Sequence, residues 1–381
     1  MNFNLQDRTI LLVVGGSRAY GIHTSTSDVD VKGVAIPPRE YFLGFSSVFE
    51  QAEGSQNMGL FTHLMTSEEQ EAIRTQKIEG TIYDIRKFLR LAADANPNIL
   101  DVLFCRDQEV RVCSHEGEIL RANRDLFVSA KANFTFSGYA IAQLKRIETH
   151  RRWLVHPPTH APTREEYGLP NQTVIPADQL AAARAAVRSK IDSWELDLGE
   201  VSPDRVIYIQ DRILETLTEI SAYLGYPDLD DAKWIAASRS IGLDDNLMLV
   251  MQKEREYEAA QREWKQYLTW KATRNPARAA LEEKYGYDTK HGAHLVRLLR
   301  MGEEIMETSQ VNVWRGDIDR EELLDIRNHG AWSFEQLIEW ARRKDQALRE
   351  LYKSGKYTIP KAPDRARLEQ LCVSLVEERI K

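Results

Sequence analysis

An apolar run that ends in two glycines is the feature that most constrains the fold of this chain. Residues 9–14 read Thr-Ile-Leu-Leu-Val-Val and are followed by Gly15 and Gly16. A short run of this kind, closed by glycine, is typical of a buried strand that enters a tight turn. Residues 29–36 partly alternate between polar and apolar side chains and end before two prolines, which predicts a second strand.

The segments that follow predict a mixed α/β unit. Residues 81–85 fit either a third strand or the lead-in to a helix. Residues 85–95 have helical periodicity and stop before an Asn-Pro pair, and residues 99–104 read as another buried segment. We therefore expect an α/β catalytic domain over residues 1–125.

Beyond residue 125 the pattern changes to long amphipathic helices, which predicts a helical domain over residues 126–381. A polar, proline-rich stretch at about residues 156–171 predicts a long loop inside it. The expected fold class is α+β: a mixed sheet with helices, followed by a mainly helical C-terminal body. The expected helices span about residues 129–153, 177–198, 203–224, 243–272, 290–307, 320–327, 333–354 and 363–380.

Composition narrows the class of protein. The 381 residues include 51 Lys and Arg and 58 Asp and Glu, so the formal net charge is −7. This charge argues against a protein that coats nucleic acid by charge alone, but it leaves room for local basic grooves. Three cysteines without paired spacing fit a reducing compartment. No early apolar run is long enough for a signal peptide or membrane span, so we expect a cytoplasmic protein without a membrane partner.

Two short motifs carry the expected chemistry. Gly16 and Ser17 follow the first strand, where backbone N–H groups and a hydroxyl can hold a phosphate. Asp28 and Asp30 come eleven residues later, and their i, i+2 spacing on a strand puts both carboxylates on one face. Each motif alone is commonly a turn or a solvated strand face. In this order, with a strand before each, they predict a nucleotide site.

Paired carboxylates repel each other unless a cation lies between them, and Mg²⁺ or Mn²⁺ fits that place. A two-metal site for displacement at phosphorus needs a third carboxylate. We expect Asp84, in an apolar context, to join Asp28 and Asp30 as a catalytic metal ligand, with Asp101 as the alternative. Asp84 also suits the N-cap of the helix that follows it.

The helix expected from residue 290 presents Lys290, His294 and Arg297 at positions i, i+4 and i+7, on one face. Three such groups in a row can hold a triphosphate, and we expect them to bind nucleotide together with Gly16 and Ser17. The alternative is an ordinary solvated helix face.

A basic cluster on the helix expected at 129–153 is a candidate RNA contact. It has Trp153 beside it, which suits phosphate contacts combined with base stacking. The alternative is a charged helix surface. The candidate residues are Lys145, Arg146, Arg151 and Arg152.

The Gly-Ser and Asp-x-Asp motifs resemble the polymerase-β nucleotidyltransferase superfamily. The longer context resembles its RNA-ligase-associated branch, the RlaP family, which is related to the YcgL-type proteins. The stretches that carry this resemblance are residues 16–21, 27–34, 84–88 with 96–98, and 287–299.

The resemblance implies transfer of an NMP from an NTP such as ATP to a hydroxyl acceptor, with release of pyrophosphate and with Asp28, Asp30 and Asp84 as metal ligands. It also suggests an RNA end as acceptor, a role in RNA repair or modification, and an associated RNA ligase. Two alternatives stay open. One is nucleotidylation of a protein or small molecule, and the other is an inactive nucleotide-binding module. The identity of the NTP is open as well.

Overall fold

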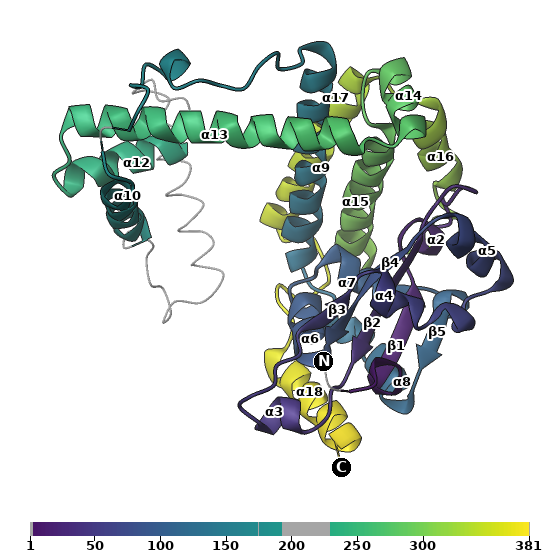
Figure 1. The fold of residues 1–381 in the computed structure, drawn as a ribbon. Helices are drawn as coiled ribbons and strands as arrows, with labels where there is room; N and C mark the ends of the chain where they lie inside the picture. Colours follow the sequence, from purple (N-terminus) through teal and green to yellow (C-terminus); the bar gives the residue numbers. More distant parts are fainter. Residues whose placement is uncertain (1–2, 174, 193–228, 381) are drawn as a thin grey trace. The chain divides into compact units, whose positions relative to one another are not determined.

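The computed structural model describes residues 3–173, 175–192 and 229–380 (Figure 1). The helix expected over residues 203–224 lies outside the described residues, as does the end of the one expected over 177–198. The strands are β1 (Thr9–Val14), β2 (Val29–Ala35), β3 (Gln51–Glu53), β4 (Ile78–Asp84) and β5 (Val110–Cys113). The helices are α1 (Leu5–Arg8), α2 (Gly16–Ala19), α3 (Glu40–Leu43), α4 (Ser55–Gly59), α5 (Ser67–Thr75), α6 (Ile85–Ala93), α7 (Pro97–Phe104), α8 (His115–Ala122), α9 (Lys131–Val155), α10 (Ala177–Asp192), α12 (Leu229–Ser240), α13 (Asp245–Thr273), α14 (Pro276–Tyr285), α15 (Thr289–Thr308), α16 (Arg320–His329), α17 (Phe334–Ser354) and α18 (Arg365–Ile380).

The chain divides into two compact units. The first, called the sheet unit here, combines Met1–His156 with Asn275–Lys381, and the second is the insert unit, Pro157–Arg274. The sheet unit is therefore built from two segments that are far apart in the sequence. The expected division into a catalytic domain at 1–125 and a helical domain at 126–381 concerns function and stays a prediction.

Five strands form one mixed sheet in the order β3-β4-β2-β1-β5 (Figure 1). β2 and β4 are parallel, and the other three pairs are antiparallel. The parallel pair needs a long crossover, which the segment containing α3, β3, α4 and α5 supplies. The expected α+β class, with a mixed sheet followed by a largely helical part, is confirmed.

Alternate residues of β2 enter two cores, one on each face of the sheet. Val29 and Val31 belong to the smaller core, together with side chains from α4 and β4. Val34 belongs to the larger core, which includes side chains from α6, α7, α9, α15 and α18. Asp30 and Lys32 have the parity of Val34, so they lie on the face that the long helices cover.

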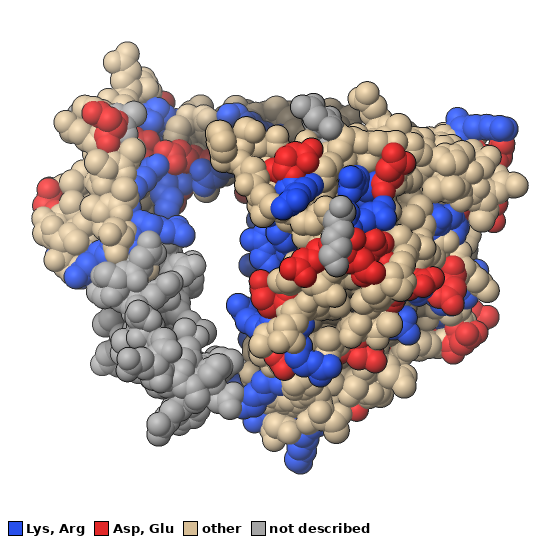
Figure 2. Space-filling view, turned by 90° about the horizontal axis from the view of Figure 1, so that it is seen from below, with Lys and Arg blue, Asp and Glu red and all other residues tan. Residues whose placement is uncertain are grey.

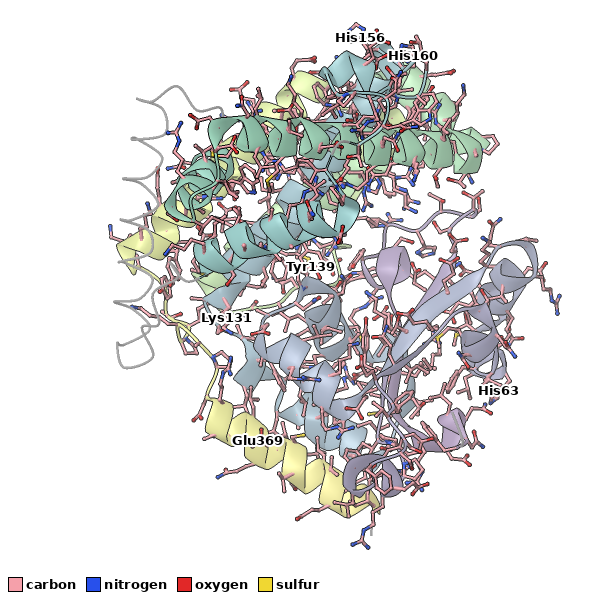
Figure 3. All side chains as sticks on the ribbon, turned by 60° about the vertical axis from the view of Figure 1, so that its left-hand side comes forward. His63, Lys131, Tyr139, His156, His160 and Glu369 are labelled. Carbon is pink, nitrogen blue, oxygen red and sulfur yellow. The ribbon has the colours of Figure 1, made fainter. Side chains whose placement is uncertain are left out.

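Three contacts fix the first half of α9 to the α/β part of the sheet unit. Figure 3 labels two of its residues, Lys131 and Tyr139. The Lys131 ammonium donates to Asp94 at 2.7 Å, and the Asn96 amide donates to the Tyr139 hydroxyl at 2.8 Å. Thr135, between them on α9, donates from its hydroxyl to the backbone oxygen of Ala95 at 2.7 Å.

The segment at 99–104 is part of helix α7. Asn96 caps this helix with its side chain, and a proline occupies the first turn, where its missing N–H costs nothing. Leu100 and Leu103 are fully buried, which explains why the segment reads as a continuous apolar run.

The described residues of the insert unit form α10, α12, α13 and the proline-rich loop. A short 3₁₀ helix, Glu165–Tyr167, interrupts this loop. The Arg164 guanidinium pairs with the Glu254 carboxylate on α13 and so ties the loop to that helix. None of the described helices combines the length and apolar character needed to cross a bilayer.

Candidate active site

The turn after β1 lies directly against Asp30. Gly16 has φ +59°, and a Cβ at this position would lie 2.1 Å from Asp30 Oδ2, so only glycine fits. The Gly15 N–H donates to the backbone oxygen of Asp30 at 2.8 Å. Ser17 lies in the first turn of α2 and lines the cavity beside Asp30. The two sequence motifs therefore meet in space.

Asp30 is the second residue of β2, and Asp28 immediately precedes this strand. Burial raises the pKa of the Asp30 carboxyl, and the carboxylates of Asp28 and Glu79 raise it further. The ammonium groups of Lys32 and Lys290 act in the opposite direction. Carboxylates gathered around a buried aspartate have the donor chemistry that a hard divalent cation requires.

Asp84 does not join this group, although its place in the sequence made it the expected third carboxylate. In the parallel register Asp30 lies opposite Glu79, whereas Asp84 lies opposite Ala35. Five residues of strand separate Asp84 from Glu79, roughly 16 Å, and the odd spacing points the two side chains to opposite faces. The Asp84 carboxylate caps α6 and pairs with Arg86, with 3.0 Å between Oδ1 and Nε.

Glu79 is the carboxylate that the sheet places beside Asp30. Its segment, Ile-Glu-Gly-Thr-Ile, has no local feature that marks it as functional. Only the pairing of β4 with β2 identifies it, because register partners on parallel strands point to the same face.

Asp101, the alternative third carboxylate, is buried and is not among the residues that line the cavity. It is 3% exposed and accepts a hydrogen bond from the Tyr20 hydroxyl at 2.5 Å. Its Oδ1 is 3.9 Å from Nη1 of Arg297. Lys32, whose pKa is lowered by burial, donates to Asn98 Oδ1 at 3.0 Å. These buried contacts hold three of the lining residues, Tyr20, Lys32 and Asn98, in place.

The three residues expected to bind nucleotide on α15 have different surroundings. Lys290 and His294 line the cavity. Arg297 is 1% exposed and is not part of the cavity lining. Its guanidinium stacks on the ring of Tyr20, with 3.6 Å to the ring centroid. Residues that share one face of α15 by their spacing therefore differ in place: Lys290 and His294 line the cavity, whereas Arg297 lies in the core.

The cavity has a volume of about 350 Å³, which is within the range of small-molecule sites. Its lining carries one acidic side chain, Asp30, against four basic ones, so it favours an anionic ligand. Acidic and basic groups are interspersed over much of the molecular face in Figure 2, in keeping with the net charge of −7. The lining residues are Gly16, Ser17, Tyr20, Ile22, Asp30, Lys32, Asn98, Gln143, Arg146, Lys290, His291, Ala293, His294 and Arg327.

Sequence reasoning missed the arginines of α16. Arg327 lines the cavity and donates to the backbone oxygen of Ile22 at 2.6 Å and to the Ser27 hydroxyl at 3.3 Å. Arg320 donates to the backbone oxygen of Gly21 at 2.6 Å. Both hold the loop between the Gly-Ser and Asp-x-Asp motifs. Their partners, two backbone oxygens and the Ser27 hydroxyl, lie some three hundred positions away in the sequence, and no local pattern predicts these contacts.

The basic cluster on α9 is divided by the fold. Arg146 lines the cavity and is exposed, and Lys145 and Arg152 are exposed as well. Arg151 instead holds the structure together, because its guanidinium donates to the backbone oxygen of Gly286 at 2.9 Å. Of the four candidate RNA contacts, Arg146 is the one at the cavity. Gln143, one helical turn before it, also lines the cavity and was not expected.

Another group of side chains has metal-ligand chemistry. Ligand atoms of His150, Glu282 and Asp288 lie within 4.8 Å of one another. Arg278 already compensates these carboxylates, since its Nη2 is 2.5 Å from Asp288 Oδ2 and its Nε is 3.9 Å from Glu282. Asp288 also caps α15. This group is separate from the carboxylates around Asp30 and has a structural explanation.

A mixed sheet in which a Gly-Ser turn meets a carboxylate pair is the arrangement expected of a polymerase-β-like nucleotidyltransferase. Residues 3–159 match the sequence model of RlaP, the RNA repair pathway DNA polymerase beta family. This match supports the polymerase-β-like RlaP branch for that segment, as the resemblance implied. The match includes β1 to β5 and α9, and leaves α15 and α16 outside it. No curated protein and no solved structure matches the chain.

The family description suggests a nucleotidyltransferase that acts in RNA repair. Proteins of the polymerase-β-like class generally use divalent metals.

Proposed function

We propose that this chain transfers an NMP from an NTP to a hydroxyl at an RNA end and releases pyrophosphate. The observation that carries the proposal is the meeting of Gly16 and Ser17 with Asp30 in a cavity whose remaining charges are mostly positive. A triphosphate matches this lining, because it is strongly anionic and needs several donors.

The carboxylates of Asp28, Asp30 and Glu79 are our candidates for holding Mg²⁺ or Mn²⁺. Asp30 and Glu79 are register partners on one face of the sheet, and the charge of Asp28 acts on Asp30, whose pKa is raised. When bound, the cation supplies positive charge that polarises the phosphate and acceptor oxygens. Glu79 thus takes the place first expected for Asp84.

The remaining residues position the substrate. Gly16 gives the backbone close access to the phosphates, and the Ser17 hydroxyl adds a donor. Lys290 and Arg327 place positive charge on the α15 and α16 side of the cavity. The acceptor oxygen forms a bond to the α-phosphorus as the bond to the β-phosphate oxygen breaks, and the hydroxyl proton passes to solvent.

The acceptor side of the proposal rests on Arg146 and on the family description. Arg146 is exposed and borders the cavity, so it can contact an RNA phosphate next to the reacting end. Lys145 and Arg152 are further candidates on the same helix. An associated RNA ligase and a cytoplasmic location remain predictions.

The test is label transfer by the full chain. Each α-labelled NTP is incubated with Mg²⁺ or Mn²⁺ and a panel of RNAs that differ in their ends. We expect label on RNA, and a loss of about 100-fold to 1000-fold in Asp30→Asn. The matched control is Asp107→Asn at an exposed carboxylate, which should keep its activity. Label on protein or on a small molecule would show that the acceptor is not RNA. Equal transfer by Asp30→Asn and the native chain would contradict the proposed active site.

A further inference from the structure

The protonation state of one imidazole nitrogen of His294 is set by a neighbouring group that can only donate hydrogen bonds. Arg297 Nη2 lies 3.1 Å from His294 Nδ1. A guanidinium has no acceptor, so Nδ1 must accept and carries no proton. The hydrogen bond therefore fixes the tautomer of a neutral His294, with its single proton on Nε2.

Arg297 is itself held on several sides. It is 1% exposed, and its Nη1 lies 2.9 Å from Met301 Sδ and 3.9 Å from Asp101 Oδ1. The Tyr20 ring covers its guanidinium, and the Tyr20 hydroxyl in turn holds Asp101. The donor that faces His294 cannot turn away without breaking this buried arrangement.

His294 is neutral in this environment. Burial lowers its pKa well below the ordinary value, and the charges of Arg297, Lys32 and Lys290 lower it further, as does His291. With Nδ1 occupied, Nε2–H is the remaining donor. Within the described parts of the chain Nε2 has no hydrogen-bond partner, and His294 lines the cavity.

We propose that His294 donates from Nε2 to an anionic phosphate oxygen in the cavity and that Arg297 is the positioning residue that fixes this tautomer. This inference rests on the proposed function, because it names the triphosphate of the nucleotide as the ligand. It also changes the role expected for Arg297, which acts through His294 and not by touching phosphate. A neutral donor of this kind binds an anion equally well across the pH range in which free histidine would titrate.

The first test measures the native chain and uses a variant only to assign the signal. Long-range ¹H–¹⁵N spectra of the full chain labelled at histidine resolve the two ring nitrogens of each of the nine histidines. His294→Gln identifies the signal. We expect an unprotonated Nδ1 and a protonated Nε2, both unchanged between about pH 6 and 8. A protonated Nδ1, or a doubly protonated ring at pH 7, would overturn the proposal.

The second test removes the positioning residue. In Arg297→Met we expect a mixture of tautomers and a histidine that titrates at higher pH, because the donor and the nearby cation are both gone. Arg297→Lys keeps the positive charge if the first variant does not fold. A tautomer that is unchanged in a folded variant would show that Arg297 does not set it.

The third test asks whether Nε2 meets the nucleotide. The amide nitrogen of glutamine can take the place of Nε2, whereas phenylalanine keeps the ring without a donor. We expect His294→Gln to bind an α,β-methylene NTP within about threefold of the native chain and His294→Phe to bind about 10-fold to 100-fold more weakly. The control is His115→Gln, a change at an exposed histidine. Equal binding by the glutamine and phenylalanine variants would exclude donation.

These results separate the inference from the function. Binding of the analogue with the stated tautomer, but without label transfer from any NTP, would contradict transferase activity and support the histidine donor. Transfer by His294→Phe with an unchanged KM for the NTP would support transferase activity and contradict the histidine donor.

Discussion

Asp30 occupies surroundings that oppose its own ionisation. Burial and two neighbouring carboxylates raise its pKa above the ordinary value of 3.8. A carboxyl whose pKa is raised by folding favours the folded state while it is protonated. That contribution is complete below the unfolded value and is lost as pH rises through the folded value. At neutral pH the metal-free protein therefore carries an electrostatic cost at this residue.

The first prediction follows from this cost. Without divalent metal, Asp30→Asn should raise the Tm at pH 7 by about 1–4 °C, because it removes the opposed charge. The difference should shrink below about pH 4, where the native carboxyl is protonated. Thermal unfolding at several pH values measures it, with Asp107→Asn as the control. A Tm at or below the native value at pH 7 would contradict this explanation of the shift.

The second prediction separates two carboxylates on one strand. Glu79→Gln should lower label transfer by about 100-fold and leave the fold unchanged, since Glu79 lies beside Asp30. Asp84→Ala should lower the free energy of unfolding by about 1–2 kcal/mol through the lost helix cap. The folded fraction of that variant should transfer label normally. The reverse outcome would return Asp84 to the site.

At the scale of single residues, the sequence predicts a site residue when its side chain lies in a recognisable local motif. Gly16, Ser17, Asp28 and Asp30 lie in two adjoining motifs, each of which follows a strand or begins one. Glu79 could not be predicted in this way, because only the pairing of β4 with β2 places it beside Asp30.

Among the elements, α15 and α16 supply five of the residues that line the cavity: Lys290, His291, Ala293, His294 and Arg327. The helical pattern at residues 290–307 predicts α15 closely, since its apolar positions recur at helical spacing and Asp288 caps it. Strands β3 and β5 are three and four residues long, too short for a pattern to form. The direction in which α16 points its arginines is a property of packing and not of periodicity.

The third prediction concerns the loop that α16 holds. Arg327→Met removes donors to Ile22 and Ser27, so residues 22–27 should loosen. The Ser27 amide, which donates to the backbone oxygen of Thr24, should exchange its hydrogen about fivefold to tenfold faster. Nucleotide affinity should fall with it. Hydrogen exchange measures the loop directly, and Arg343→Met at an exposed position is the control.

Unchanged exchange at Ser27 in a folded Arg327→Met variant would mean that the loop keeps its conformation without α16. A loss of affinity would then be due to the missing charge alone.

For the molecule as a whole, the larger core joins both segments of the sheet unit. It contains Ile10 from β1, Ile147 from α9, Leu299 from α15 and Leu375 from α18. Nothing in composition marks the insert unit as separate, because amphipathic helices continue through it. The α+β class was predictable from the two apolar runs and the later helices, but this discontinuity was not.

The fourth prediction uses that discontinuity. Replacing Pro157–Arg274 by a flexible linker of about ten residues should leave a cooperatively folded sheet unit that still binds nucleotide. A fragment of residues 1–125 should not fold stably, because it lacks the α9 and α15 side chains of the larger core. Thermal unfolding with and without the NTP analogue measures both. A stable, nucleotide-binding 1–125 fragment would contradict this view.

The bond between Arg327 and Ile22 spans 305 positions of the chain. A ribosome that adds about 5–20 residues per second needs roughly 15–60 s to pass from one to the other. Throughout that time the nascent polypeptide contains Asp28 and Asp30 but not Arg327, one of the basic residues that line the cavity. The full cavity lining is thus present only after residue 327 has been added, and a message cut short before α15 yields a product without Lys290 and Arg327.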